Sequence, residues 1–160
     1  MKFTTQREIR ETAGQRKKHV TQFTPVERHD LEKVIRKVLR KWLKHGITTT
    51  KHLKNKVINH ETQFSYRLTM ETMLNHEIIE YNVTGSDRRV VLRSKTPHSF
   101  ITPYTSDTTG NLGVQCIVIS LNSGKVVTSY INLLEDDHKT LDTRRYDKHL
   151  KINLENVLTR

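Results

Sequence analysis

The chain has 160 residues, of which 34% are hydrophobic and 28% charged, and its formal net charge is +11 at pH 7. This balance fits one domain, or one domain with an appendage, and excludes a compositionally disordered chain. No run reaches the length of a membrane helix, and the charged opening Met1–Val20 lacks the apolar stretch of a secretory signal. We therefore expect a cytoplasmic protein.

Cofactor motifs are missing from the sequence. The single cysteine, Cys116, excludes an intrachain disulfide, and its place in a Val/Ile-rich run indicates a buried thiol. The histidines show no H-x-x-x-H or H-E-x-x-H spacing, and there is no G-x-x-x-x-G-K-S/T loop. We expect no metal and no other cofactor.

The positive charge is concentrated in the first part of the chain. Residues 1–95 hold 21 Lys and Arg against 10 Asp and Glu, a net of +11, whereas residues 96–160 hold 7 of each. Such asymmetry favours a polyanion as the binding partner over an anionic membrane surface. We expect this partner to be RNA, with DNA as the alternative. Solvated lysines that serve only solubility would give the same count.

Residues 1–24 read as a flexible basic arm because apolar residues are few and no period is sustained. Thr24 and Glu27 form a capping box around Pro25, which predicts a helix to about His45 that Gly46 ends. Apolar residues recur along this helix at steps of three and four, and cations fill the rest. We expect its basic side to bind nucleic acid, together with one hairpin arginine: Arg36, Lys37, Arg40, Lys41, Lys44 and Arg88.

Further elements follow in order. Helices are predicted over Thr48–Lys56 and from Ser65 to about His76. A first hairpin joins Ile78–Val83 to Arg89–Ser94, and a second joins Cys116–Ser120 to Lys125–Asn132 around Asn122-Ser123-Gly124. Residues 96–113 between them read as a long loop, and Leu150–Asn153 as a last short strand. The predicted fold is α+β, with N-terminal helices packed on a four-stranded antiparallel sheet built from the two hairpins.

A polar cluster follows the second hairpin. It consists of Asn132, Asp136, Asp137, His138, Thr140, Asp142 and Tyr146. A histidine among carboxylates and hydroxyls has the groups needed for proton transfer at neutral pH, because its ordinary pKa lies near 6.5. A solvated turn has the same composition, and in that reading His138 only caps it.

The segment from His76 to Ile152 resembles a known family in its order of strand, N-S-G-K turn, V-V-T-S-Y-I-N strand, D-D-H-K-T-L-D and R-Y-D. It is similar to small metal-independent ribonucleases of the barnase, EndoU, colicin D and RelE superfamily, especially those carried by phages and mobile elements. The resemblance implies an α+β domain that presents its site on one face of an antiparallel sheet. It also implies RNA cleavage by the substrate's own 2′-hydroxyl, and several members are toxins.

The resemblance assigns roles to particular residues. His138 is the expected general acid or base, with Asp137 or Asp142 orienting its ring. Tyr146 is expected to donate a second proton or stack on a base. Cations expected to stabilise the phosphate are Arg89, Arg93 and Lys139. Thr128 and Tyr130 alternate along one strand, so they face one side of the sheet and are expected to line one cleft. Asn132 is expected to be a supporting residue. In the alternative interpretation, the hairpin charges are merely solvated, and this applies to Arg88, Arg89 and Arg93.

Residues 25–160 are predicted to form a single domain, with 25–95 as helices plus first hairpin, 96–113 as loop and 114–160 as second hairpin and polar segment. Our leading interpretation is a metal-independent endoribonuclease, a toxin or phage effector, for which a neutralising protein is a possible partner. The runner-up is a winged-helix-like DNA-binding protein with residues 84–89 as the wing. A third is an inhibitor that binds a host protein through Glu135–Asp137.

Overall fold

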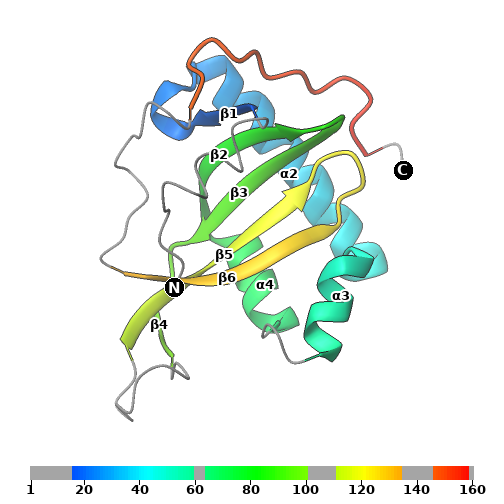
Figure 1. Cartoon of the computed structure of the whole chain (residues 1–160), viewed down its shortest axis with the longest axis vertical. Helices are drawn as coiled ribbons and strands as arrows, with labels where there is room; N and C mark the ends of the chain where they lie inside the picture. Colours follow the sequence, from blue (N-terminus) through cyan, green and yellow to red (C-terminus); the bar gives the residue numbers. More distant parts are fainter. Residues whose placement is uncertain (1–15, 60–63, 101–110, 135–145, 159–160) are drawn as a thin grey trace.

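The computed structural model describes residues 16–59, 64–100, 111–134 and 146–158. It is an α+β fold in which helices pack on one side of an antiparallel sheet (Figure 1). The helical elements are η1 (Val20–Gln22), α2 (Pro25–His45), α3 (Lys51–Ile58) and α4 (Tyr66–Leu74). The strands are β1 (Arg16–His19), β2 (His76–Thr84), β3 (Asp87–Ser94), β4 (His98–Phe100), β5 (Asn111–Ser120) and β6 (Val126–Leu133).

The predicted bounds of helix α2, Pro25–His45, are confirmed. They could be predicted because local signals determine both ends of the helix. The Thr24 hydroxyl accepts a hydrogen bond from the Glu27 amide at 3.1 Å, and the Glu27 carboxylate accepts one from the Thr24 amide at 2.9 Å. At the other end Gly46 adopts φ 87°, a conformation that favours glycine. The apolar side of α2 enters the core, where the Trp42 indole donates to the Gly124 carbonyl at 2.9 Å.

Helices α3 and α4 are capped by the hydroxyls of Thr50 and Ser65. Helix α4 is shorter than predicted, because His76 already pairs with Ser94 in the sheet. Two of its threonines are buried against β5, where the Thr72 hydroxyl donates to Gln115 at 2.7 Å and the Gln115 amide donates to Thr69 at 3.2 Å. These side-chain hydrogen bonds therefore hold the middle of α4 against the sheet.

An ion pair holds α2 to the start of β2. The His76 ring lies 3.3 Å from a Glu32 carboxylate oxygen, and its other nitrogen lies 2.9 Å from the Met73 carbonyl. Burial alone would lower the pKa of His76, but these hydrogen bonds outweigh it and raise the pKa. The same hydrogen bond lowers the pKa of Glu32. Charged His76 and ionised Glu32 thus stabilise each other.

The sheet has six strands among the described residues. Strands β1, β2, β3 and β5 are neighbours in that order, and both β4 and β6 also pair with β5. The four predicted strands are present, and the predicted total of four is wrong because β1 and β4 add to it. Strand β1 comes from residues assigned to a flexible arm, and β4 and the start of β5 come from the predicted loop 96–113. Residues 1–15 and 101–110 lie outside the described part. Short polar strands are predicted poorly because pairing with a neighbour, rather than their own pattern, stabilises them.

Two further differences concern the C-terminal segment and the first hairpin. Leu150–Asn153 forms no strand; instead, Leu150 is buried in the core that α2 and the sheet share. The first hairpin lies inside the sheet, because β3 pairs with β5 on its far side. A wing of a winged-helix domain reaches out from its sheet, whereas the Leu121 amide here donates to the Arg88 carbonyl at the hairpin end.

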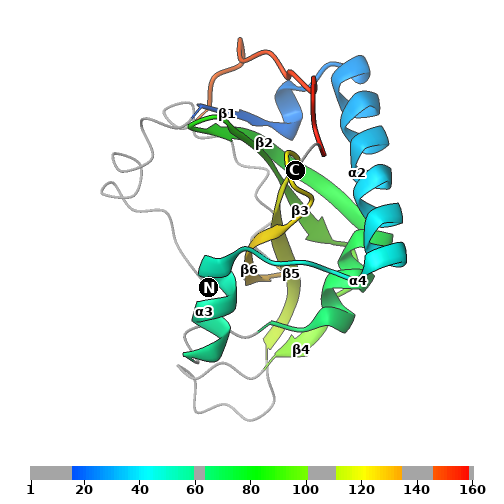
Figure 2. The ribbon, with the colours of Figure 1, turned by 90° about the vertical axis from the view of Figure 1, so that its right-hand side faces the viewer.

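The helices define the two faces of the sheet. Figure 2 shows α2 running along one side of the strands. Side chains that alternate toward this side are apolar and buried, and include Tyr81, Val90, Leu92, Ile117 and Ile119. Their sequence neighbours point to the opposite face of the sheet.

Candidate active site

The face of the sheet that points away from α2 is rich in polar residues. We call it the polar face, and its members on β2, β3, β5 and β6 are Glu80, Asn82, Arg89, Arg93, Cys116, Thr128, Tyr130 and Asn132. Pairing between strands places these residues in adjacent rows across the sheet. Arg93 is opposite Cys116, which in turn is opposite Tyr130.

Glu80 lies on this face in β2, the strand next to β1. It pairs with Val91, and Val91 lies on β3 between Arg89 and Arg93. The Glu80 side chain is only 7% exposed. One carboxylate oxygen accepts a hydrogen bond from the Tyr146 hydroxyl at 3.1 Å. The Asn82 amide donates to the other oxygen at 3.4 Å, so the buried carboxylate has a donor at each oxygen.

The structure thus joins Tyr146 to the sheet through a residue that sequence reasoning missed. Glu80 and Asn82 alternate with Ile79, Tyr81 and Val83 in the buried middle of β2. A carboxylate and an amide on one side of a buried strand were the signal that would have identified the site.

His19 is a second functional candidate that the sequence did not single out. It pairs with Glu80 in the ladder of β1 and β2, and its side chain is fully buried. Its ring meets Tyr146 edge to face, with 5.1 Å between centroids and 73° between planes. Its Nδ1 atom accepts a hydrogen bond from the Thr21 amide at 3.3 Å. Assignment of β1 to a flexible arm hid this arrangement.

Tyr130 faces the same cluster from β6. Burial raises its pKa well above the ordinary value for tyrosine, and Cys116 and the charge of Glu80 add to the effect. The Tyr130 phenol therefore stays protonated near neutral pH. Thr128 and Asn132 lie on the same side of β6, and Thr128 is half-buried while Asn132 is buried.

The two predicted phosphate-binding arginines of β3 flank Glu80. The Arg93 guanidinium contacts a Glu77 carboxylate oxygen and the Leu134 carbonyl, both at 3.3 Å. The Arg89 guanidinium donates to Asp87 at 2.7 Å and keeps about a quarter of its side chain exposed, 27%. Each arginine is held by a carboxylate at the rim of the polar face, which fixes the direction of its guanidinium.

The predicted nucleic-acid-binding residues do not join this site. Arg88 points away from it and donates to the Asn153 carbonyl at 2.8 Å. Lys41 on α2 donates to the Ser123 carbonyl at 3.0 Å. The other predicted cations are exposed on α2, on the far side of the sheet, and they are Arg36, Lys37, Arg40 and Lys44.

Part of the predicted site falls outside the described residues. Those predictions concern Asp137, His138, Lys139, Asp142 and the acidic segment Glu135–Asp137. The flanks of this segment are described. The Leu134 carbonyl accepts a hydrogen bond from Arg93, and Tyr146 contacts Glu80. Both flanks therefore lie at the polar face.

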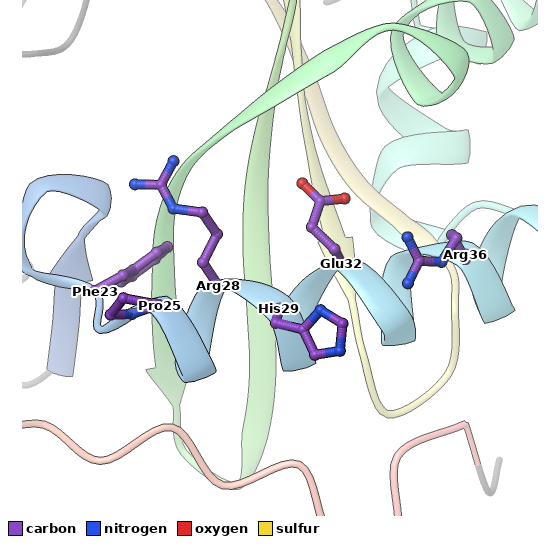
Figure 3. Close-up of a pocket in the computed structure, with 6 residues that line it drawn as sticks. All are labelled: Phe23, Pro25, Arg28, His29, Glu32 and Arg36. Atoms are coloured by element: carbon purple, nitrogen blue, oxygen red, sulfur yellow. The ribbon is translucent and has the colours of Figure 1, made fainter.

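A separate hollow runs beside the first half of α2, where Arg28 and Glu32 extend to one side of the helix (Figure 3). It is lined by Phe23, Pro25, Arg28, His29, Glu32 and Arg36. The Glu32 carboxylate is held by His76, as described above. This hollow has cations at its rim but lacks the converging acid and base groups of the polar face.

Two features are absent from the described ranges, a metal-binding cluster and a membrane-spanning helix. Across residues 16–59, 64–100, 111–134 and 146–158, no three His, Cys, Asp or Glu side chains gather as they would around a metal ion. Within the same ranges, no helix combines the length and apolar character needed to cross a membrane.

No protein family, curated protein or solved structure matches the chain.

Proposed function

We propose that the chain is a metal-independent endoribonuclease whose active site is the polar face of the sheet. The observation that supports it is the meeting of separately predicted residues around one carboxylate. The Tyr146 hydroxyl donates to Glu80, and the charge of Glu80 acts on Tyr130. Arg93 lies on β3 two residues from Val91, the partner of Glu80, and both flanks of the His138 segment reach this face. An acid, a base and cations on one face are the parts that this reaction needs.

In the proposed reaction, the half-buried Tyr146 hydroxyl meets the RNA and Glu80 lies behind it. The proton of the ribose 2′-hydroxyl passes to the Tyr146 oxygen while the Tyr146 proton moves to the Glu80 carboxylate. The 2′-oxygen attacks phosphorus, and the bond between phosphorus and the 5′-oxygen breaks. His138 donates a proton to that leaving oxygen, which gives a 2′,3′-cyclic phosphate and a 5′-hydroxyl.

Arg89 and Arg93 supply positive charge on both sides of the reacting phosphate. Negative charge grows on the phosphorane oxygens, and guanidinium groups whose direction is already fixed stabilise it without further ordering. Thr128 and Asn132 offer hydrogen bonds to ribose or base along β6. Lys139 and the carboxylates of Asp137 and Asp142 retain their proposed roles beside His138. A cytoplasmic location, a toxin or phage-effector role and a neutralising protein partner belong to the same proposal.

The test is incubation of the purified protein with total RNA in excess chelator, followed by analysis of the product 3′ ends. Discrete fragments with 2′,3′-cyclic phosphate ends are expected. A Tyr146→Phe variant, which keeps the ring and loses the hydroxyl, should cut at least tenfold more slowly, whereas Tyr66→Phe on the helical side should cut like the parent. Intact RNA across a range of pH would rule the proposal out.

A further inference from the structure

A row of cations follows the solvent side of α2. We call it the cation stripe, and its members are Lys33, Arg36, Lys37, Arg40 and Lys44, all exposed. Because a helix turns about 100° per residue, these five positions fall within an arc of about 100°. Leu31, Ile35, Val38 and Trp42 fall on the opposite side of the helix and are buried in the core. The stripe therefore faces directly away from the sheet.

Within the described ranges, the side chains of the stripe are not engaged by the rest of the fold. Among the described residues, no hydrogen bond or ion pair engages these five side chains. Glu27 binds Lys18 at 2.9 Å, and Glu32 binds His76. The charge of Glu32 also acts on Arg36, which leaves most of the stripe without a nearby carboxylate. Asp30 alone adds an exposed carboxylate near the N-terminal end of the stripe. Five like charges held along one side of a rigid helix repel one another unless an anion lies against them.

We propose that the cation stripe binds the phosphate backbone of a nucleic acid, at a surface separate from the polar face. From Lys33 to Lys44 the helix rises about 16 Å, a length over which duplex DNA presents about ten phosphate charges. Arg36 and Arg40 lie one turn apart, and guanidinium groups bind phosphate through paired hydrogen bonds. The hollow of Figure 3 continues the surface through Arg36 to Arg28 and His29.

The burial of α2 argues against an anionic membrane as the partner. A helix that lies in a membrane interface inserts its apolar side between lipids. Here that side is packed against the sheet, with Leu31 and Val38 fully buried. Of the apolar residues of α2, Val26 and Leu43 are largely exposed. They lie at opposite ends of the helix and so offer no continuous apolar side for insertion between lipids, whereas the row of Lys and Arg suits a charged backbone.

The stripe and the polar face lie on opposite sides of the sheet. A nucleotide bound at Glu80 cannot at the same time contact the stripe. We therefore expect binding at α2 to be independent of the nucleic-acid sequence and of cleavage at the polar face. The stripe would tether the protein to one stretch of a long nucleic acid while another stretch reaches the polar face. Its binding is measurable whether or not the chain cleaves RNA.

The experiment uses the full chain and a fluorescent DNA duplex of about 20 base pairs, which lacks the 2′-hydroxyl that the proposed reaction consumes. The dissociation constant is measured by anisotropy between 50 and 200 mM salt. The Arg36→Gln/Arg40→Gln variant should reduce the slope of log K against log salt by about 1.8, at about 0.9 per phosphate contact. If the affinities converge at 1 M salt, this slope predicts binding about 60-fold weaker at 0.1 M.

The matched control is Lys51→Gln/Lys54→Gln on α3, which removes the same charge from two exposed positions outside the stripe. It should leave the slope within about 0.3 of the parent. Equal losses in both variants would overturn the proposal, because net charge alone would then explain binding. Parental binding by the α2 variant would also overturn it, as would binding to phosphatidylserine vesicles without binding to DNA. Circular dichroism and the thermal midpoint verify that both variants fold.

Discussion

Replacement of Glu80 by glutamine removes a buried charge from the polar face and keeps the shape of the side chain. The Tyr146 hydroxyl can still donate to the amide oxygen, but the bond changes from charge-assisted to neutral, which costs about 1 kcal/mol. The amide nitrogen then faces the Asn82 amide, which adds a cost of about 1 kcal/mol unless Asn82 turns over. Together these changes should lower the thermal midpoint by about 4 to 8 °C for a chain of this size.

The effect on cleavage should be much larger than the effect on folding. Without the carboxylate, the proton of the 2′-hydroxyl has no acceptor behind Tyr146, and kcat should fall about 100-fold to 10,000-fold. The assay is single-turnover cleavage of a fluorescent RNA in chelator, at a temperature where circular dichroism shows both proteins folded. The control is Glu71→Gln, which alters a half-buried carboxylate on the helical side that contacts His98. A folded Glu80→Gln protein that cleaves within threefold of the parent would refute the assignment.

Three further predictions follow from the described contacts. Arg93→Lys keeps the charge but loses the forked contacts to a carboxylate and a carbonyl, so cleavage should slow at least tenfold, whereas Arg88→Lys should cleave normally. The raised pKa of His76 means that its ion pair with Glu32 contributes fully below the unfolded-state pKa near 6.5 and is lost as pH rises through the folded pKa. The free energy of unfolding should therefore drop by roughly 1 kcal/mol more between pH 6 and 8.5 in the parent than in Glu32→Gln, measured by urea titration. Trp42→Phe should cost about 2 to 3 kcal/mol, because it leaves a buried carbonyl without its donor and a cavity in the core, while cleavage per folded molecule stays unchanged.

Local signals made much of the helical part predictable. The capping box of Thr24 and Glu27 and the glycine at position 46 determine the ends of α2 at short range, so sequence alone located them. The turns at Gly85 and Gly124 were predictable for the same reason, since both glycines adopt positive φ. Strand β1 was not predictable, because its polar residues are ordered by pairing with β2 and by the contact between Lys18 and Glu27.

The candidate site, too, could be predicted from the sequence only in part. Strand alternation could place Tyr130 on one face of the sheet, whereas Arg93 and Tyr146 were named through the resemblance. Glu80 and His19 could not be named, since their meeting with Tyr146 depends on a pairing between residues 61 positions apart and on the path of the chain after β6. The basic residues of α2 were correctly predicted to be exposed, except Lys41, but sequence periodicity does not tell which side of a sheet a helix covers.

Attack by the 2′-hydroxyl is the central claim, and a single substrate pair tests it. Once a cleavage position is mapped in an RNA oligonucleotide, the same oligonucleotide is made with one 2′-deoxyribose immediately 5′ to the cut phosphate. The account predicts cleavage of the RNA and at least a 1,000-fold loss at the modified position, with unchanged cleavage elsewhere. Equal cleavage of both oligonucleotides would contradict the mechanism.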